Sequence, residues 1–162
     1  MMNAVPVLHT RRCVLREIAR DEIPTLRQIV DDDLFQRFLP ELYELVKSEE
    51  GLHRFIKSFE TYAQHDDGVL WGVETDDILV GFVAIMDVSY DPILFYAMHP
   101  RHRNQGYAKE TVSEVARHFI EKFPNLDLHT EVYNDNHASI SILQSCGFKV
   151  IDHKTSKIVL AL

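Results

Sequence analysis

The residues best suited to chemistry lie between Ile93 and Ala108, where an apolar strand-like segment runs through a proline into an amphipathic helix. A loop that enters a helix leaves several backbone N–H groups unpaired at one point, and the positive end of the helix dipole adds to them. Gly106 lets a ligand approach this backbone closely, and Arg101 and Arg103 add cationic side chains. The pattern predicts a site for an anion such as a pyrophosphate. The segment contains neither a GKS/T nor a GxGxxG motif, which argues against a nucleotide P-loop and a dinucleotide fingerprint.

Three short motifs follow one another along the chain: Arg103-x-x-Gly106-x-Ala108 after a strand, Asn136-x-x-Ser139, and Gly147-Phe148 at the end of the next helix. In this order and spacing they resemble the GNAT acetyltransferase superfamily, and the resemblance extends over nearly the whole chain. Ser139 and Leu143 stand where many superfamily members carry alanine and a catalytic tyrosine. This pattern resembles the subgroup that acetylates the N-termini of ribosomal proteins (RimJ/RimL-like), together with its relatives that act on other amines.

The resemblance implies that acetyl-CoA binds to this chain and gives its acetyl group to a primary amine. The pantetheine would enter between two splayed strands, Ile93–Met98 and Leu126–Val132, and a backbone N–H near Met98 would polarise the thioester carbonyl. Ser139 would protonate the departing CoA thiolate, although a helix cap and small-residue packing also explain Ser139 and Asn136. The residues implied to contact the cofactor are Ala97, Met98, Arg103, Asn104, Gln105, Gly106, Tyr107, Ala108 and Asn136.

The general base is not identified by the resemblance. Relatives often carry a glutamate three residues before the tyrosine that matches Tyr96, and here that position is Ile93, which cannot accept a proton. Glu131, Asp87 and Tyr96 are candidate substitutes, and each is also explained as a surface or packing residue. A peptide α-amine with a pKa of ~7.8 is roughly one tenth neutral at pH 7, whereas a lysine-like amine at ~10.4 is only ~0.04% neutral. The missing base therefore favours a weakly basic acceptor.

Composition and charge narrow the class of protein. A chain of 162 residues, with no repeat and no obvious linker, is expected to form one domain over residues 1–162. The formal net charge of −8 argues against partners that need a basic surface, namely nucleic acids and anionic membranes. The longest apolar run, Ile78–Met86, is far shorter than the ~20 residues of a transmembrane helix. We expect a protein that binds neither nucleic acid nor membrane.

The cysteines indicate a protein of a reducing compartment, and the histidines do not form a metal-binding pattern. Cys13 and Cys146 form no CxxC motif and are expected to be reduced, buried thiols, and the N-terminus lacks the features of a secretory signal. We therefore expect a cytoplasmic location. His99 and His102 lie three residues apart, but no carboxylate or cysteine pair accompanies them, so no metal is predicted.

The hydrophobic pattern predicts the elements that position these residues. Strands and helices follow in the order β-α-α-α-β-β-β-α-β-α-β-β, which indicates an α/β (α+β) domain. With the resemblance, we expect a mixed, mostly antiparallel sheet of about seven strands with helices on both faces. Asp21 is expected to cap the first helix, Pro40 to end the second, and Gly147 to end the last one. The final strand, Ile158–Leu162, is either an exposed edge or an interior strand.

Other functions stay open at this stage. One alternative is a non-catalytic module that binds acyl-CoA. Another is an acetyltransferase that acts on an antibiotic, a polyamine or an amino acid. The acidic residues Asp31, Asp32, Asp33, Glu41 and Glu44 either attract a cationic acceptor or serve as helix caps and a solvated surface. The oligomeric state, monomer or homodimer, is not determined by the sequence. The absence of a suitable Cys or Ser triad favours direct attack by the amine in a ternary complex over an acyl-enzyme.

Overall fold

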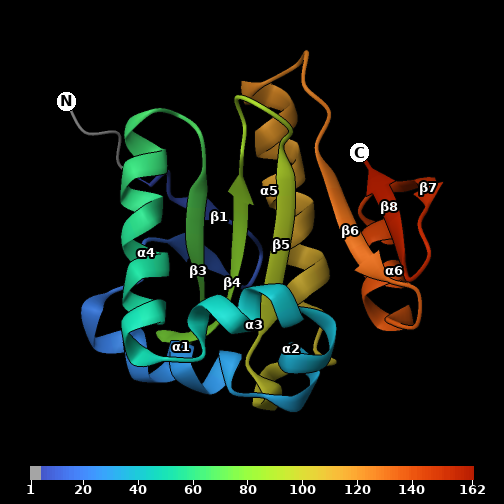
Figure 1. The fold of residues 1–162 in the computed structure, drawn as a ribbon. Coiled ribbons are helices and arrows are strands. Elements are labelled where there is room, and N and C mark those ends of the chain that lie inside the picture. Colours follow the sequence, from blue (N-terminus) through green and yellow to red (C-terminus); the bar gives the residue numbers. More distant parts are fainter. Residues whose placement is uncertain (1–4) are drawn as a thin grey trace.

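Eight strands form one open sheet in the computed structural model, which describes residues 5–162 (Figure 1). Their order across the sheet is β1-β2-β3-β4-β5-β6-β8-β7. Neighbouring strands pair antiparallel, except for β5 and β6, which run parallel. This confirms the mixed, mostly antiparallel sheet, and the opening segment supplies two short strands where the sequence predicted one. The strands are β1 Leu8–His9, β2 Val14–Arg16, β3 Val69–Thr75, β4 Ile78–Met86, β5 Ile93–Met98, β6 His129–Tyr133, β7 Lys149–His153 and β8 Lys157–Ala161.

Helices cover both faces of this sheet, as the sequence predicted. Figure 1 shows α1 to α4 on one face and α5 on the other, with α6 beside β6 and β8. Two hydrophobic clusters fill the spaces between helices and sheet, one with side chains from α1 to α4 and one with side chains from α5 and α6. The α-helices within the described residues are α1 Ile23–Val30, α2 Asp33–Phe38, α3 Pro40–Val46, α4 Glu49–Gln64, α5 Tyr107–Lys122 and α6 His137–Ser145.

The start of the first helix differs from the expectation, and a helix that the sequence did not predict follows the second. Asp21 does not cap α1, because it lies within a short 3-10 turn, and it is the Glu22 carboxylate that accepts a hydrogen bond from the Ala19 amide at 2.9 Å. Helix α2 ends at Phe38, just before Pro40, as expected. Pro40 then occupies the first turn of α3, where a backbone N–H has no partner within the helix, so a further short helix begins there.

The C-terminal half follows the predicted pattern more closely. Gly147 has φ +98 after α6, and its N–H donates to the Gln144 carbonyl at 3.1 Å, while the Phe148 N–H donates to Leu143 at 3.0 Å. These bonds are those of a glycine-terminated helix. Strand β8 lies between β6 and β7, so the apolar final strand is interior, and the exposed β7 forms the edge of the sheet.

Candidate active site

The loop between β5 and α5 contains two residues in the left-handed region. Asn104 has φ +61, and Gly106, the N-cap of α5, has φ +83. No side chain of the described residues caps the first turn of this 16-residue helix, so its N–H groups remain available at the positive end of the dipole. Alternation of left- and right-handed residues turns backbone amides toward a common point, which suits an anion. Residues 103–108 therefore lie together at the N-terminus of α5.

Arg12, between β1 and β2, fixes the conformation of this loop. Its Nη1 donates to the Gln105 carbonyl at 2.8 Å, and its Nε lies 2.8 Å from Oε1 of Glu110. The guanidinium also lies 4.5 Å from the centre of the Tyr107 ring. A Cβ on Gly106 would approach Arg12 Nη2 to 3.1 Å. The sequence analysis missed Arg12, because 93 residues separate it from Gln105 and no local pattern connects them.

Arg103 is ion-paired rather than free. Its guanidinium contacts the carboxylate of Asp32, which also caps α2 by accepting from the Leu34 and Phe35 amides. Burial disfavours the ionised form of Asp32, but hydrogen bonds from Arg103 and from the α2 amides outweigh this effect and lower its pKa. Arg101 is exposed in the 3-10 turn that follows β5. Of the two arginines expected to bind an anion, Arg103 is therefore already ion-paired with a carboxylate of the chain itself.

The parallel strands β5 and β6 diverge from each other, as Figure 1 shows. Their register consists of a single pair, Ile93 with His129, near the start of both strands. Beyond this pair the two strands are no longer paired, so the backbone groups on this edge of β5 have no partner on β6. This confirms the predicted opening between two splayed strands, although the second strand begins at His129 rather than at Leu126.

The hydrogen bonds of β5 show which backbone groups face this opening. The N–H of His99 donates to the Val80 carbonyl on β4 at 2.7 Å. Because backbone amides alternate in direction along a strand, the N–H of Met98 points away from β4 and toward the opening. The backbone of Ala97 faces β4, where its oxygen would lie 2.6 Å from a Cβ on Gly81. Of the two residues expected to offer backbone groups to a ligand, Ala97 therefore has its backbone directed toward β4, and Met98 has an N–H directed away from it.

A tyrosine and a serine meet across the opening. The Tyr96 hydroxyl on β5 lies 2.7 Å from Oγ of Ser139 on α6. Asn136 caps α6, because its Oδ1 accepts from the Ser139 N–H at 3.3 Å, so it holds the strand-to-helix turn. Burial raises the pKa of Tyr96 to about 12, against the opposing effect of its hydrogen bond with Ser139. Tyr96 is therefore a protonated phenol at neutral pH and can donate its proton to the serine oxygen.

The other residues considered as general bases lie elsewhere. Glu131 is ion-paired with Lys154 and has 27% of its side chain exposed. Along β6 it alternates with the buried Thr130 and Val132, so it lies on the opposite face of the sheet from them. Val132 belongs to the same hydrophobic cluster as Tyr96, and the structure does not bring Glu131 and Tyr96 together. Asp87, with φ +57, begins the tight turn that follows β4.

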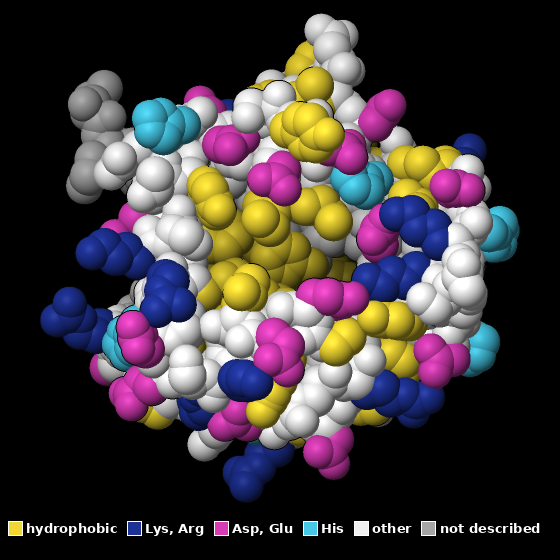
Figure 2. Space-filling model, in the orientation of Figure 1, with side chains coloured by type: hydrophobic (Ala, Val, Ile, Leu, Met, Phe, Trp, Pro, Cys, Tyr) yellow, Lys and Arg dark blue, Asp and Glu magenta, His cyan; other side chains and the backbone are white. Residues whose placement is uncertain are grey.

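A hollow with an apolar floor lies on the face of the sheet that carries α1 to α4 (Figure 2). The partly buried apolar side chains that β4 and β5 contribute to this face are Met86, Phe95 and Ala97. The ring of Phe95 has its centre 6.3 Å from those of Phe55 on α4 and Phe82 on β4. Such aromatic packing stabilises the layer between the sheet and these helices.

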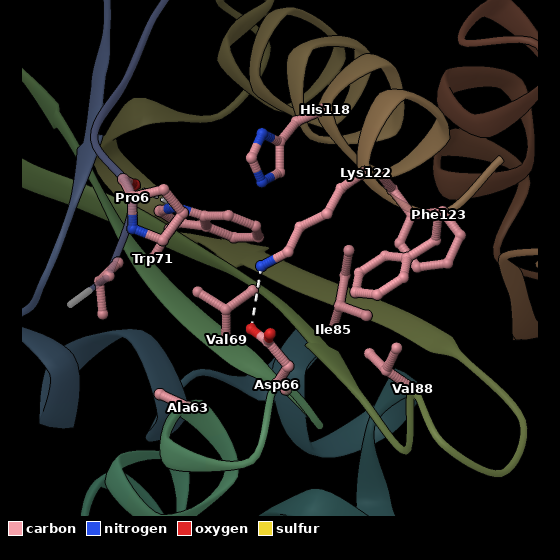
Figure 3. Close-up of a pocket in the computed structure, with 13 residues that line it drawn as sticks. Pro6, Ala63, Asp66, Val69, Trp71, Ile85, Val88, His118, Lys122 and Phe123 are labelled. Atoms are coloured by element: carbon pink, nitrogen blue, oxygen red, sulfur yellow. Dashed lines mark hydrogen bonds and ion pairs between the residues drawn. The ribbon is translucent and has the colours of Figure 1, made fainter. Parts of the chain in front are cut away.

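A separate cavity of about 280 Å³ lies at the other end of α5 (Figure 3). In its wall the Trp71 indole donates to the Pro6 carbonyl at 2.8 Å, and Lys122 lies 3.0 Å from Asp66 at its mouth. His118 stands edge-on to Trp71. Because His118 and Lys122 belong to the last turns of α5, this cavity is roughly 20 Å along the helix from the loop at its start. None of the site residues predicted from the sequence lines it, among those described.

The histidines near the loop serve local structure. Nδ1 of His99 accepts from the Arg101 amide at 3.1 Å, and Nε2 lies 2.9 Å from the side-chain oxygen of Gln28. Burial and the neighbouring cationic groups lower the pKa of His99. Over residues 5–162, no three His, Cys, Asp or Glu side chains are grouped to hold a metal ion. In the same range, no helix combines the length and the apolar character needed to span a membrane.

Comparison with known proteins gives consistent matches. The chain is 26% identical over 149 residues to the uncharacterized N-acetyltransferase YoaA of Bacillus subtilis, covering 89% of this chain and 83% of that protein. RimL, a ribosomal-protein alpha-N acetyltransferase solved in complex with coenzyme A, superposes with a TM-score of 0.83 at 13% identity, over 97% of each chain. An acetyltransferase from Salmonella typhimurium that modifies the N-terminal serine of a 50S ribosomal subunit protein has a TM-score of 0.78 at 13% identity, covering 97% of this chain and 98% of that one. These two structures share the fold.

A family model decides the assignment. The model described as the acetyltransferase (GNAT) domain matches residues 12–149 of the 162. The match includes both the loop at the start of α5 and the turn at the start of α6, and it spans most of the chain. The chain therefore belongs to the GNAT acetyltransferase family.

Proposed function

We propose that this protein is an N-acetyltransferase that moves the acetyl group of acetyl-CoA to a primary amine by direct attack in a ternary complex. The observation that carries the proposal is the divergence of β5 from β6 after a single residue pair, which leaves one edge of β5 unpaired between the uncapped start of α5 and the Tyr96–Ser139 pair. A long ligand with a pyrophosphate at one place and a thioester at another fits this layout. RimL, which shares the fold, was solved with coenzyme A bound.

The cofactor's groups can be matched to this chain's residues. The backbone of residues 103–108 would hold the pyrophosphate, because its amides converge there and Gly106 leaves the space of a side chain free. The pantetheine would follow the free edge of β5. The Met98 N–H would bond the thioester oxygen, and this bond would strengthen as negative charge develops on it. Asn136 would act by holding the turn that presents Ser139.

The reaction needs no covalent enzyme intermediate. The amine nitrogen attacks the thioester carbon, a C–N bond forms, and the C–S bond breaks with its electron pair remaining on sulfur. Ser139 passes its hydroxyl proton to that sulfur and is restored by a proton from Tyr96, which is reprotonated from solvent. The nitrogen releases one proton to water as the amide forms. Cys146 is not placed as a nucleophile, because its sulfur accepts a hydrogen bond from Ser113 at 3.2 Å beside α5.

The acceptor is a weakly basic amine such as the α-amine of a peptide. A neutral α-amine is a few hundredfold more abundant at pH 7 than a neutral lysine-like amine. The acidic residues considered as attractors of a cationic acceptor are largely engaged, and four of the five form ion pairs: Asp31 with Arg27, Asp32 with Arg103, Glu41 with Lys157 and Glu44 with Lys47.

Both cysteines are free thiols, which suits action in the cytoplasm. Cys13 is buried as expected, whereas Cys146 is only partly buried.

Release of free thiol from acetyl-CoA tests the proposal. The acceptors are a short peptide with a free N-terminal serine, the same peptide with that amine blocked, and spermidine. We expect turnover of the first, none of the second, and a lower kcat/KM for the third. The matched control is Ser139→Ala, which should lower kcat while the stabilisation by acetyl-CoA persists. If acetyl-CoA binds but no amine releases thiol, the protein is a binding module. If spermidine exceeds every α-amino peptide, the acceptor assignment is wrong.

A further inference from the structure

Side chains of α2 and α3 contact the C-terminal part of the sheet and the turn that follows β6. The Arg37 guanidinium on α2 donates to the Asp135 carboxylate at 2.7 Å. The Glu41 carboxylate on α3 accepts from the Tyr133 hydroxyl at 3.0 Å and from the Lys157 ammonium at 3.1 Å. The Lys157 ammonium also lies 4.7 Å from the centre of the Tyr133 ring. These contacts, here called the α2–α3 bridge, join segments that are 92 to 116 residues apart in the chain.

The α2–α3 bridge meets β6 at the end that is not paired with β5. The one residue pair between these strands joins Ile93 to His129, the first residue of β6. Tyr133 is the last residue of β6 and lies roughly 13 Å farther along the strand. Lys157, its register partner, begins β8. The bridge therefore connects the two parts of the sheet where strand pairing between them has ended.

The turn at the end of β6 is the one that presents Ser139. It is closed by a hydrogen bond from the Asn136 N–H to the Tyr133 carbonyl at 3.0 Å. The Asn136 side chain accepts from the Ser139 N–H at 3.3 Å, and the Ser139 hydroxyl lies 2.7 Å from that of Tyr96 on β5. A displacement of this turn is therefore passed to Ser139 through a short series of hydrogen bonds.

Helix α2 is tied at its other end to the loop between β5 and α5. Asp32, the N-cap of α2, is ion-paired with Arg103 of that loop, whereas Arg37 in the last turn of α2 is ion-paired with Asp135. The six residues of α2 thus connect the loop at the start of α5 with the turn at the start of α6. Acetyl-CoA has a limited reach from its pyrophosphate to its thioester, so the separation of these two segments has to match that reach.

From these contacts, and on the basis of the proposed acetyl transfer, we infer that Arg37 and Glu41 are positioning residues that hold Ser139 at the CoA sulfur. They act through the turn at residues 133–136 and take no part in the proton transfer. Exposed ion pairs are individually weak, so the loss of one residue should lower kcat only several-fold. The loss of both should have a larger effect, because a displacement of about 1 Å at the reacting atoms can cost about 100-fold in rate.

A double-mutant cycle with Ser139→Ala tests this role by thiol release with the peptide acceptor. With Ser139 present, we expect Arg37→Gln to lower kcat about threefold, and Arg37→Gln combined with Glu41→Ala to lower it about tenfold. The KM for acetyl-CoA and the rise in Tm with acetyl-CoA should stay unchanged. In the Ser139→Ala background, the same changes should lower kcat no further, because the residue through which they act is absent. The matched control is Arg54→Gln, which breaks an exposed ion pair with Glu50 within α4 and should leave kcat unchanged.

An exchange of charges separates the ion pair from other effects of the substitutions. Arg37→Asp combined with Asp135→Arg should recover kcat relative to Arg37→Asp alone, because the opposite charges again face each other. Equal losses of kcat with and without Ser139 overturn the inference, since the bridge would then act independently of Ser139. An unchanged kcat in all bridge variants also overturns it. An unchanged kcat for Ser139→Ala alone overturns the acid in the proposed function, and the inference with it. Absence of transfer to any amine by the wild type overturns the proposed function itself.

Discussion

Gly106 gives the sharpest test of the cofactor loop. Its φ of +83 lies in the region that favours glycine, and a Cβ there would lie 3.1 Å from Nη2 of Arg12. Replacement by glutamate adds a strain of about 1–2 kcal/mol and places a carboxylate beside the amides that we expect to bind pyrophosphate. The variant should therefore fold with lower stability and lose its affinity for acetyl-CoA.

The size of the expected rise in Tm follows from the free energy by which ligand binding stabilises the folded protein. A ligand present at about 100 times its Kd stabilises the folded protein by roughly 2.7 kcal/mol. With an unfolding entropy of about 2.1 cal/mol/K per residue, the 162 residues of the chain give roughly 0.34 kcal/mol/K. The Tm of the wild type should then rise by about 8 °C with acetyl-CoA. Thermal unfolding with and without the ligand measures this rise, which Gly106→Glu should abolish.

A substitution at a second glycine distinguishes the effect of backbone strain from loss of the cofactor site. Gly147 has φ +98, and a Cβ there would meet Leu162 Cδ1 at 3.4 Å, so Gly147→Glu carries a similar backbone strain outside the loop. Both variants should unfold a few degrees below the wild type, at about 1–2 kcal/mol of strain. Only Gly147→Glu should keep the full response to acetyl-CoA. A full response of Gly106→Glu would refute the placement of the pyrophosphate, and loss of response in both would show that strain alone explains the result.

Three further changes test other parts of the structure. Tyr96→Phe removes the 2.7 Å bond to Ser139, and we expect kcat to fall about tenfold with unchanged stabilisation by acetyl-CoA; an unchanged kcat in steady-state kinetics would contradict the relay. Asn136→Ala removes the cap of α6 and should cost about 1 kcal/mol in thermal unfolding, whereas Asn136→Ser should cost little. The hydrogen bond from Arg16 lowers the pKa of Glu22, so this carboxylate contributes stability above the unfolded pKa of ~4.3 that is lost as pH falls through the folded value. Denaturation from pH 7 to 3 should show the advantage of wild type over Glu22→Gln, about 1 kcal/mol, disappearing with acid.

Turns and helix ends that are specified by neighbouring residues are predicted well from the sequence. The hairpin of β3 and β4 turns at Asp76 and Asp77, whose φ values are 51 and 64, and two aspartates between apolar runs are a local turn signal. Gly147 ends α6 for the same kind of reason. Pro40 both follows α2 and begins α3, and only the second role was not predicted, because the formation of α3 depends on its packing against α4.

Contacts between distant segments could not be predicted in the same way. Tyr96 and Ser139 are 43 residues apart, and their hydroxyl groups meet only once β5 and α6 are folded against the same cluster. His129 belongs to none of the motifs. It is the register partner of Ile93 in the parallel pair of β5 and β6, and its Nδ1 lies 3.2 Å from Oδ1 of Asp91.

The pairing of Arg103 with Asp32 shows which part of the loop must carry anion binding. A pyrophosphate that took this guanidinium would have to displace a carboxylate that also caps α2, and the gain of one ion pair would be offset by the loss of another. The amides of residues 103–108 have no such competitor, since no side chain of the described residues caps α5. Their convergence depends on backbone conformation, which Gly106 sets and Arg12 holds from outside. Affinity for the cofactor should therefore respond more strongly to a change at Gly106 than to the loss of the Arg103 charge.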